Sequence, residues 1–274
     1  MTRTPLPAAI LVFSLASASA SWAEGDRGLP LSGSDAERFL REAVIVSSKP
    51  IGVGITRPKK VTLSDGFRTH DAVWKTVDEI RRGLNRGRKG GYQLGTWDSY
   101  RYEVAAYELD KLLGLGIVPP TVEREIDGRR GSLQMWVEGG FTELDRRERS
   151  LTAPDIVRWS DRLGQLRLFQ SLVYDSDYLN IRNILYDESF QVYSIDHSRA
   201  FRIYPVLLEE ARLVRFSRAL LARLEALTRD ELDAALGGWL KAPEIDGILA
   251  RRDKILARAR SAAERLGDET VFYP

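Results

Sequence analysis

Cysteine is absent from the 274-residue chain, and histidine occurs only twice, as His70 and His197. The absence of cysteine excludes a disulfide framework, a thiolate zinc site and a cysteine nucleophile. The scarcity of histidine excludes a metal site built from three histidines, and a Ser-His-Asp triad would have to use one of these two. The chemistry of the chain must therefore come from carboxylates, amides, hydroxyls and lysine.

The chain also lacks a strong excess of charge of either sign. It has 41 Lys and Arg against 39 Asp and Glu, so the formal net charge is +2. No field of one sign attracts nucleic acid or an acidic membrane, and we expect no nucleic-acid partner. Hydrophobic residues make up 43% of the sequence, which is enough for the core of a soluble globular protein. The length suits one large domain or two small lobes.

A mainly apolar run occurs near the N-terminus. Arg3 is the only charge before Glu24, the residues from Leu6 to Ala18 are mostly apolar, and small residues with A-x-A-like cleavage sites follow up to Ala23. The run is shorter than the roughly 20 residues of a membrane span. It predicts a signal peptide over residues 1–23, hence an exported protein, periplasmic or secreted, with no membrane span after cleavage. A buried N-terminal helix is the alternative.

The periodicity of the sequence changes near Gly139-Gly140. A leader and short helix over 24–40 precede β-like segments, and the helix expected from Ser99 is the main exception in that part. After the glycines the pattern is helical, with a small hairpin over 184–195. We expect an α+β protein with a β-rich N-lobe over 41–138 and a mainly helical C-lobe over 139–274. The basic, glycine-rich stretch 81–95 predicts a loop.

Three features of the first half suit the binding of a nucleoside triphosphate. Gly52 and Gly54 lie between two strands, where their backbone amides could cover phosphates, although an ordinary hairpin has the same pattern. Lys75 ends an apolar strand and could hold phosphate oxygens, or it could face solvent. Glu103, on the following helix, could form an ion pair with this lysine, or it could be an exposed helix residue.

The strongest local signal lies in the second half. Asn183 precedes a strand, a turn and a strand, and Asp196 follows the second strand. The hairpin therefore brings the two residues side by side at its open end. An amide oxygen and a carboxylate together are hard ligands suited to Mg²⁺ or Mn²⁺. Asp175 and Asp177 lie shortly before, on the preceding loop.

Two stretches resemble a known family. The run Glu103-Val-Ala-Ala-Tyr-Glu-Leu-Asp-Lys-Leu-Leu-Gly-Leu-Gly-Ile-Val-Pro-Pro-Thr-Val looks like the αC region of the secretory-pathway kinases, the Golgi casein kinase and four-jointed group. The segment from Asn183-Ile-Leu to Ile195-Asp196 resembles that group and also the phosphatidylinositol and HipA-type kinases. The resemblance covers roughly residues 51–202. It implies a bilobal, protein-kinase-like fold that uses ATP with Mg²⁺ or Mn²⁺.

The resemblance also implies roles for individual residues. Lys75 would hold the ATP phosphates, and Glu103 would pair with it or help to order metal and phosphate. Asp177 would be the catalytic carboxylate, and Asn183 and Asp196 would be metal ligands. Residues 132–138 would form the hinge that meets the adenine. The nucleotide-binding residues would then be Gly52, Gly54, Lys75, Met135 and Val137.

The spacing leaves alternatives for two of these roles. Asp175 and Asn180 have the five-residue separation often seen between a kinase's catalytic Asp and its metal-site Asn. Asn183 has the 13-residue separation from Asp196 that the hairpin needs. We favour Asn183, with Asp177 as the catalytic residue. Where many kinases have Asp-Phe-Gly this chain has Asp196-His-Ser, and we expect His197 to pack or hydrogen-bond.

The sequence therefore predicts an ATP-dependent phosphotransferase. Its acceptor would be a hydroxyl of a protein, with a sugar or a lipid head group as the next choices. A non-catalytic, kinase-shaped binding module is an alternative from a different class. A metal-dependent phosphohydrolase would need denser Asp and His ligation than a chain with two histidines offers.

Overall fold

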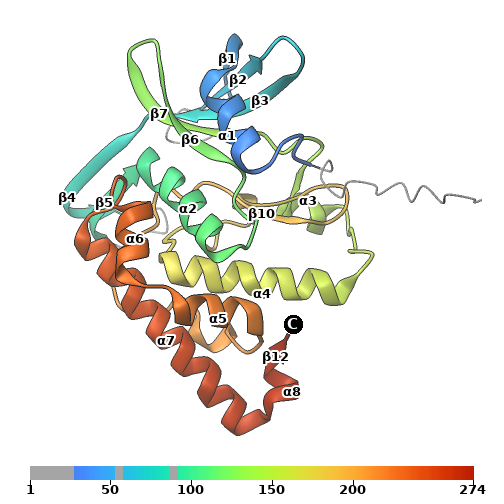
Figure 1. Ribbon diagram of the computed structural model, residues 1–274, viewed down its shortest axis with the longest axis vertical. Helices are drawn as coiled ribbons and strands as arrows, with labels where there is room; N and C mark the ends of the chain where they lie inside the picture. The colour runs from blue at the N-terminus through green and yellow to red at the C-terminus, as the bar shows by residue number, and fades with distance from the viewer. Residues whose placement is uncertain (1–27, 53–57, 87–91) are drawn as a thin grey trace, which may run out of the picture.

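The computed structural model describes residues 28–52, 58–86 and 92–274. An antiparallel sheet forms most of the N-terminal part, and helices dominate the C-terminal part (Figure 1). Within the described ranges, no helix combines the length and apolar character needed to cross a membrane. The α+β class expected from the sequence is confirmed.

The N-terminal sheet has five strands in the order β1-β2-β3-β7-β6, with antiparallel neighbours. These strands are β1 (Val44–Pro50), β2 (Lys59–Ser64), β3 (Thr69–Lys75), β6 (Thr121–Ile126) and β7 (Arg129–Met135). Alternation along β3 buries Ala72 and Trp74 on one face. Helix α1 (Gly33–Glu42) packs against this core through Phe39 and Leu40. The Lys75 side chain consequently lies on the opposite face of the sheet.

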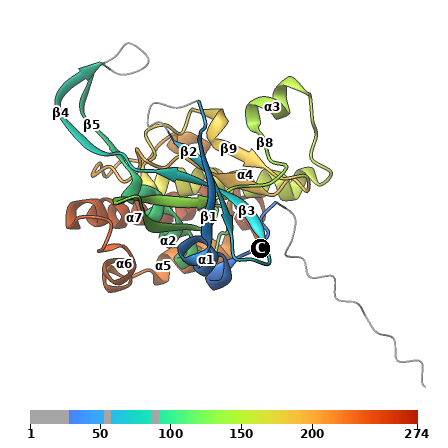
Figure 2. The ribbon, with the colours of Figure 1, turned by 90° about the horizontal axis from the view of Figure 1, so that it is seen from above.

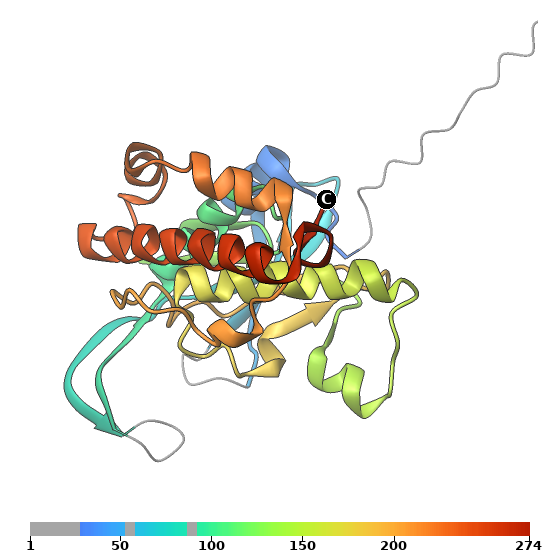
Figure 3. The same ribbon diagram turned by 90° about the horizontal axis from the view of Figure 1, so that it is seen from below.

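The segment between β3 and the next helix is a hairpin and not the loop that its composition predicts. Strands β4 (Asp78–Arg86) and β5 (Tyr92–Ser99) pair antiparallel and extend away from the rest of the molecule (Figures 2 and 3). The register shifts between Arg81 and Leu84, which accommodates extra residues in one strand. The two strands of a projecting ribbon satisfy each other's backbone hydrogen-bonding groups. Their sequence need not alternate apolar and polar residues, so the usual signal for a strand is absent.

Helix α2 (Tyr100–Leu113) begins where the sequence predicts it. The Ser99 hydroxyl accepts a hydrogen bond from the Arg101 N–H at the N-terminus of the helix. The helix ends at Gly114, whose φ of +65° favours glycine. Most of α2 is buried, because it packs against both the sheet and the C-terminal helices (Figure 1). Helix α2 therefore lies at the junction of the two parts.

The C-terminal part begins with short elements and continues with longer helices. Its elements are β8 (Phe141–Thr142), α3 (Glu143–Glu148), α4 (Ile156–Val173), η1 (Ile181–Asn183), β9 (Ile184–Tyr186), β10 (Val192–Ser194), η2 (Glu210–Arg212), β11 (Phe216–Ser217), α5 (Arg218–Ala226), α6 (Arg229–Leu236), α7 (Ala242–Leu266), α8 (Asp268–Val271) and β12 (Phe272–Tyr273). The expected hairpin is present as β9 and β10.

A second hydrophobic core lies among these helices. Leu166, Phe169 and Leu172 of α4 share it with Ile248 and Ile255 of α7. Helix α7 packs against α4 (Figure 3). The packing fixes the C-terminal end of α4, from which the chain enters the loop that carries Asp175 and Asp177.

Candidate active site

Lys75 lies between two carboxylates that come from distant parts of the chain. Its Nζ is 2.6 Å from Glu103 Oε1 on α2 and 2.8 Å from Asp196 Oδ1 after β10. The Lys75 side chain is 12% exposed and that of Glu103 is 1% exposed. Three residues singled out in the sequence thus form one charged cluster at the junction of the sheet and the helices.

The three groups shift one another's pKa. Burial by itself lowers the pKa of Lys75, but attraction to Asp196 and Glu103 outweighs it and raises the pKa above its ordinary value. The positive charge of Lys75 lowers the pKa of Asp196. Burial raises the pKa of Glu103, although Lys75 opposes this effect. Lys75 is therefore a cation at neutral pH, and Asp196 is ionised.

The β9–β10 hairpin brings Asn183 and Asp196 together as the spacing predicts. At its open end the Ile195 N–H donates to the Asn183 carbonyl oxygen over 3.0 Å. Asp196 has a φ of +64°, a left-handed conformation that is uncommon outside glycine and that costs free energy. The neighbouring His197 N–H donates to Glu103 Oε2 over 3.0 Å. The turn is thereby attached to α2.

Asn180 bridges two of the predicted functional residues. Its Nδ2 lies 3.2 Å from Asp177 Oδ2 and 3.1 Å from Asn183 Oδ1. The amide nitrogen must face these atoms, because both are acceptors. Sequence spacing offered Asn180 only as an alternative to Asn183. Its position three residues from both partners was the available signal for a bridging role.

Asp175 and Asp177 have different surroundings. Asp175 is 1% exposed, and burial raises its pKa to about 7. Its Oδ1 accepts the Asp177 N–H over 2.9 Å, and its Oδ2 is 3.8 Å from His197 Nδ1. Asp177 is only partly buried. Because an acceptor hydroxyl has to reach the catalytic carboxylate, this difference favours Asp177 for that role.

His197 lies inside the protein. It is 0% exposed, and its ring meets Phe169 edge-on with centroids 5.8 Å apart. Burial lowers its pKa to about 4, so the imidazole is neutral at pH 7. The arrangement agrees with the expectation that His197 packs and does not act as a base.

The predicted phosphate-binding turn lies at the same end of the sheet as Lys75. Pro50 is opposite Lys59, and Lys59 is opposite Trp74, the neighbour of Lys75. Gly52 follows β1 with a φ of +74°, a conformation that favours glycine. Gly54 lies outside the described residues.

The predicted hinge retains few free backbone groups. The Met135 N–H donates to the Pro120 carbonyl, and the Trp136 N–H donates to the Asp71 carbonyl. The Met135 side chain is buried in the core under the sheet. In contrast, the Val137 N–H makes no backbone hydrogen bond to any described residue. Val137 is therefore a better candidate than Met135 for donating to an adenine ring.

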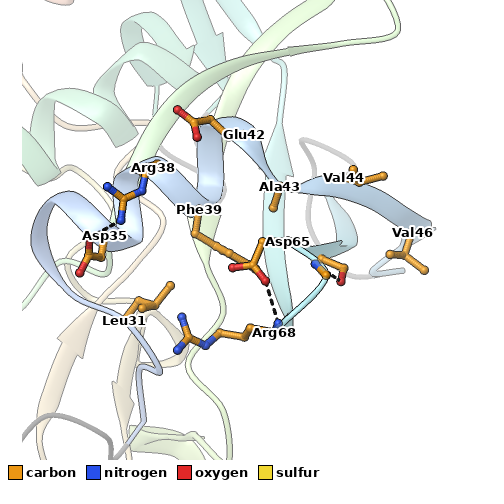
Figure 4. A pocket seen from close by; sticks show the side chains of 12 residues that line it. Leu31, Asp35, Arg38, Phe39, Glu42, Ala43, Val44, Val46, Asp65 and Arg68 are labelled. Atoms are coloured by element: carbon orange, nitrogen blue, oxygen red, sulfur yellow. Dashed lines mark hydrogen bonds and ion pairs between the residues drawn. The ribbon is translucent and has the colours of Figure 1, made fainter.

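One groove in the described part of the chain lies away from this cluster. It has a volume of about 810 Å³ and runs between α1, the start of β1 and the β2–β3 turn (Figure 4). Phe39, Ala43, Val44 and Val46 give it apolar walls, and Arg68 is at its rim. No predicted site residue lines it, so its size is no evidence about catalysis.

The donor set fits a divalent cation only in part. Asp196 and Glu103 offer carboxylate oxygens and Asn183 offers an amide oxygen, which are hard ligands. Among the described residues, no three His, Cys, Asp or Glu side chains are grouped to hold a metal ion. The Asn183 Oδ1 atom that would bind the ion also accepts the Asn180 amide over 3.1 Å. These residues suit a Mg²⁺ or Mn²⁺ ion that takes further ligands from a phosphate and water.

Comparisons with known proteins identify the fold. No family model matches the chain. Among curated proteins, the DNA-directed RNA polymerase subunit Rpo1N of Thermococcus celer is 28% identical in an alignment of 149 residues that covers 47% of this chain. The chain spans only 16% of that subunit's length.

Three solved structures match most of the chain. The structure of hydra Fam20 with sugar has a TM-score of 0.66 at 17% identity and covers 90% of this chain and 95% of its own. The Golgi casein kinase has a TM-score of 0.65 at 14% identity, with 90% and 81% covered. The Helicobacter pylori proinflammatory kinase CtkA has a TM-score of 0.53 at 10% identity. The match covers 83% of this chain and 98% of CtkA.

These structures define the class. The chain has an atypical protein-kinase-like fold, and the predicted resemblance to the Golgi casein kinase group is confirmed at the level of the fold.

Proposed function

We propose that this protein is an ATP-dependent phosphotransferase that transfers the γ-phosphoryl group to a hydroxyl. The observation that carries the proposal is Lys75, held between Glu103 and Asp196 within a kinase-like fold. Phosphoryl transfer depends on positioning and charge, and these three residues supply a fixed cation and two carboxylates where a kinase needs them.

The residues divide the work of the transfer. Lys75 attracts phosphate oxygens, and Glu103 fixes the orientation of Lys75. Asn183 and Asp196 would hold a Mg²⁺ or Mn²⁺ ion, which when bound neutralises charge on the phosphates. Asp177 accepts the proton of the acceptor hydroxyl while the oxygen of that hydroxyl bonds to the γ-phosphorus. The bond from that phosphorus to the bridging oxygen breaks, and ADP leaves.

The acceptor and the compartment are part of the proposal. A protein hydroxyl is the first choice of acceptor, with sugar and lipid hydroxyls next. The N-terminal segment 1–23 supports export to the periplasm or the secretory pathway, where the source of ATP would differ from that in the cytoplasm. A non-catalytic binding module is the second candidate, because the direct Lys75–Asp196 ion pair occupies an oxygen that a metal ion would use.

A transfer assay tests the proposal. The full chain is incubated with ATP labelled at the γ-phosphate, Mg²⁺ or Mn²⁺, and a generic protein acceptor. We expect label on the acceptor with wild type and with Lys111→Met, and none with Lys75→Met. Lys111 is a matched control because it is also ion-paired but lies on α2 beside Glu37 and Glu108. ATP binding without transfer to any acceptor would favour the binding module.

A further inference from the structure

Arg251 on α7 is the largest fully buried side chain among the described residues, with 0% exposure. None of the ion pairs found in that part of the chain includes it. A buried charge without a partner is costly, so something else must stabilise this cation. Three backbone carbonyl groups do so.

The carbonyl groups belong to two separate segments. Arg251 Nε donates to the Leu172 carbonyl over 2.6 Å, and Nη1 donates to those of Arg202 and Tyr204 over 2.7 and 2.6 Å. Leu172 lies in the last turn of α4, where the helix dipole adds negative potential. One side chain thus connects the end of α4 to the segment that follows Asp196.

These segments carry the two halves of the candidate site. Leu172 is five residues before Asp177, and Arg202 is six residues after Asp196. Direct bonds also join them. The Phe201 N–H donates to the Val173 carbonyl over 2.6 Å, and the Ser176 hydroxyl donates to the Arg199 carbonyl over 2.9 Å. A shift of either segment would move Asp177 relative to Asp196.

Both segments contain backbone that is costly to hold. Tyr174 and Phe201 have φ values of +47° and +57°, in the left-handed region that side chains other than glycine avoid. Such residues cost free energy and persist only where their surroundings fix them. Arg251 binds the carbonyl of Leu172, two residues before Tyr174, and that of Arg202, the residue after Phe201. It therefore lies where an anchor has the most effect.

The neighbouring turn of α7 leaves room for this arrangement. A Cβ added at Gly247 would lie 2.9 Å from Arg251 Nη1 and 3.1 Å from the Arg202 carbonyl oxygen. The first contact is closer than real Cβ atoms approach, and the second is tighter than most. A glycine at this position lets the guanidinium and segment 202–204 approach the helix.

We propose that Arg251 is a positioning residue for catalysis, which fixes the loop of Asp177 against the turn of Asp196 through these three carbonyls. The inference rests on the proposed phosphotransferase function. An arginine suits the role because its planar fork can serve several acceptors at once, and lysine offers a single ammonium group.

The test compares Arg251→Met and Arg251→Lys with Arg252→Met. Arg252 is the matched control, because it is the adjacent α7 arginine and binds the Leu227 carbonyl, away from the site. Hydrogen exchange is measured on the full chain without nucleotide, and kcat and KM for ATP are measured well below the melting temperature. We expect faster exchange at the Phe201 amide in both Arg251 variants and wild-type exchange there in Arg252→Met.

In catalysis, Arg251→Met should lower kcat about 10-fold or more with KM for ATP changed less than threefold, since small misplacements are costly to rate. Arg251→Lys should recover part of the loss. If Arg251→Met does not fold, Gly247→Ala serves in its place. Unchanged exchange at Phe201, or equal losses of kcat in the Arg251 and Arg252 variants, would overturn the proposal. Wild type with protected Phe201 but no transfer activity would instead refute the proposed function.

Discussion

The two halves of the candidate site are held by different kinds of interaction. Around Lys75, a buried ion pair joins strand β3 to Glu103, which lies on a helix attached to both parts of the molecule. Around Asp177, neutral amides and strained backbone hold a loop. Removing a partner of Lys75 leaves a buried charge without its counter-charge. A change around Asp177 alters the geometry of the loop.

Helix α2 shows how firmly the first half is fixed. Lys111 pairs with Glu37 of α1 over 2.7 Å. The Arg101 guanidinium donates to the carbonyl groups of Gly238 and Trp239 in the C-terminal part. The Tyr102 hydroxyl donates to Glu244 of α7. Glu103 therefore sits on a helix whose neighbours belong to both parts, and we expect the Lys75–Glu103 pair to persist without nucleotide.

Lys75→Met is expected to have the largest effect, because it leaves Glu103 and Asp196 without their shared cation. Breaking a buried ion pair in this way costs about 3–5 kcal/mol. Urea unfolding should show this loss, and calorimetry should show no ATP binding. Lys111→Met, at a more exposed pair, should change stability by about 1 kcal/mol or less. Equal stability losses in the two variants would contradict the contrast between the halves.

Asp177→Asn should have the next largest effect, and only on turnover. The substitution keeps an acceptor for Asn180 but removes the group that takes the hydroxyl proton. We expect turnover to fall by about 10²-fold or more, with ATP affinity and melting temperature unchanged. Steady-state kinetics beside calorimetry would measure this. A fall in affinity that matched the fall in turnover would place Asp177 among the nucleotide-binding residues.

Substitutions of Asn180 should have smaller effects on kcat, and the order of the two variants is informative. Asn180→Ala removes the bridge between Asp177 and Asn183, and we expect roughly a 10-fold loss of kcat. Asn180→Asp has nearly the same shape but places a second carboxylate beside Asp177. It should be worse than the alanine variant, because like charges repel and no N–H remains to donate. An active Asn180→Asp protein would show that the bridge is not needed.

The buried pair Asp175 and His197 predicts a pH effect on stability. Asp175 has a folded pKa raised to about 7, so its contribution favours folding at low pH and is lost as the pH rises towards 7. His197 has a folded pKa lowered to about 4, so its contribution is lost as the pH falls below about 6.5. Between about pH 4 and 6.5 the two slopes oppose each other.

Single substitutions should separate these slopes. Asp175→Asn should make the unfolding free energy rise with pH over that window, and His197→Gln should make it fall. Urea unfolding at several pH values would measure both. Parallel slopes in the two variants would show that the pair does not titrate as described.

Sequence could predict those parts of the site that follow from chain direction and short-range pairing. The sequence predicted the strand that ends at Lys75, and the 13-residue separation predicted that Asn183 lies beside the turn of Asp196. The β4–β5 ribbon was missed because its basic, glycine-rich composition is typical of a loop. Arg251 gave no signal, because its partners are carbonyl groups, which every residue carries. The signal peptide and the exact lobe boundaries stay predictions.

Calorimetric titration of the full chain with ATP and Mg²⁺ or Mn²⁺ tests the central claim most directly. We predict metal-dependent binding by the wild-type protein and its abolition in Asp196→Ala, with the melting temperature of that variant close to that of wild type. The variant keeps the Lys75–Glu103 pair, so lost binding would report on the metal and phosphate site and not on the fold. Wild-type protein that binds no nucleotide at millimolar ATP with either metal, or equal binding by Asp196→Ala, would contradict the account.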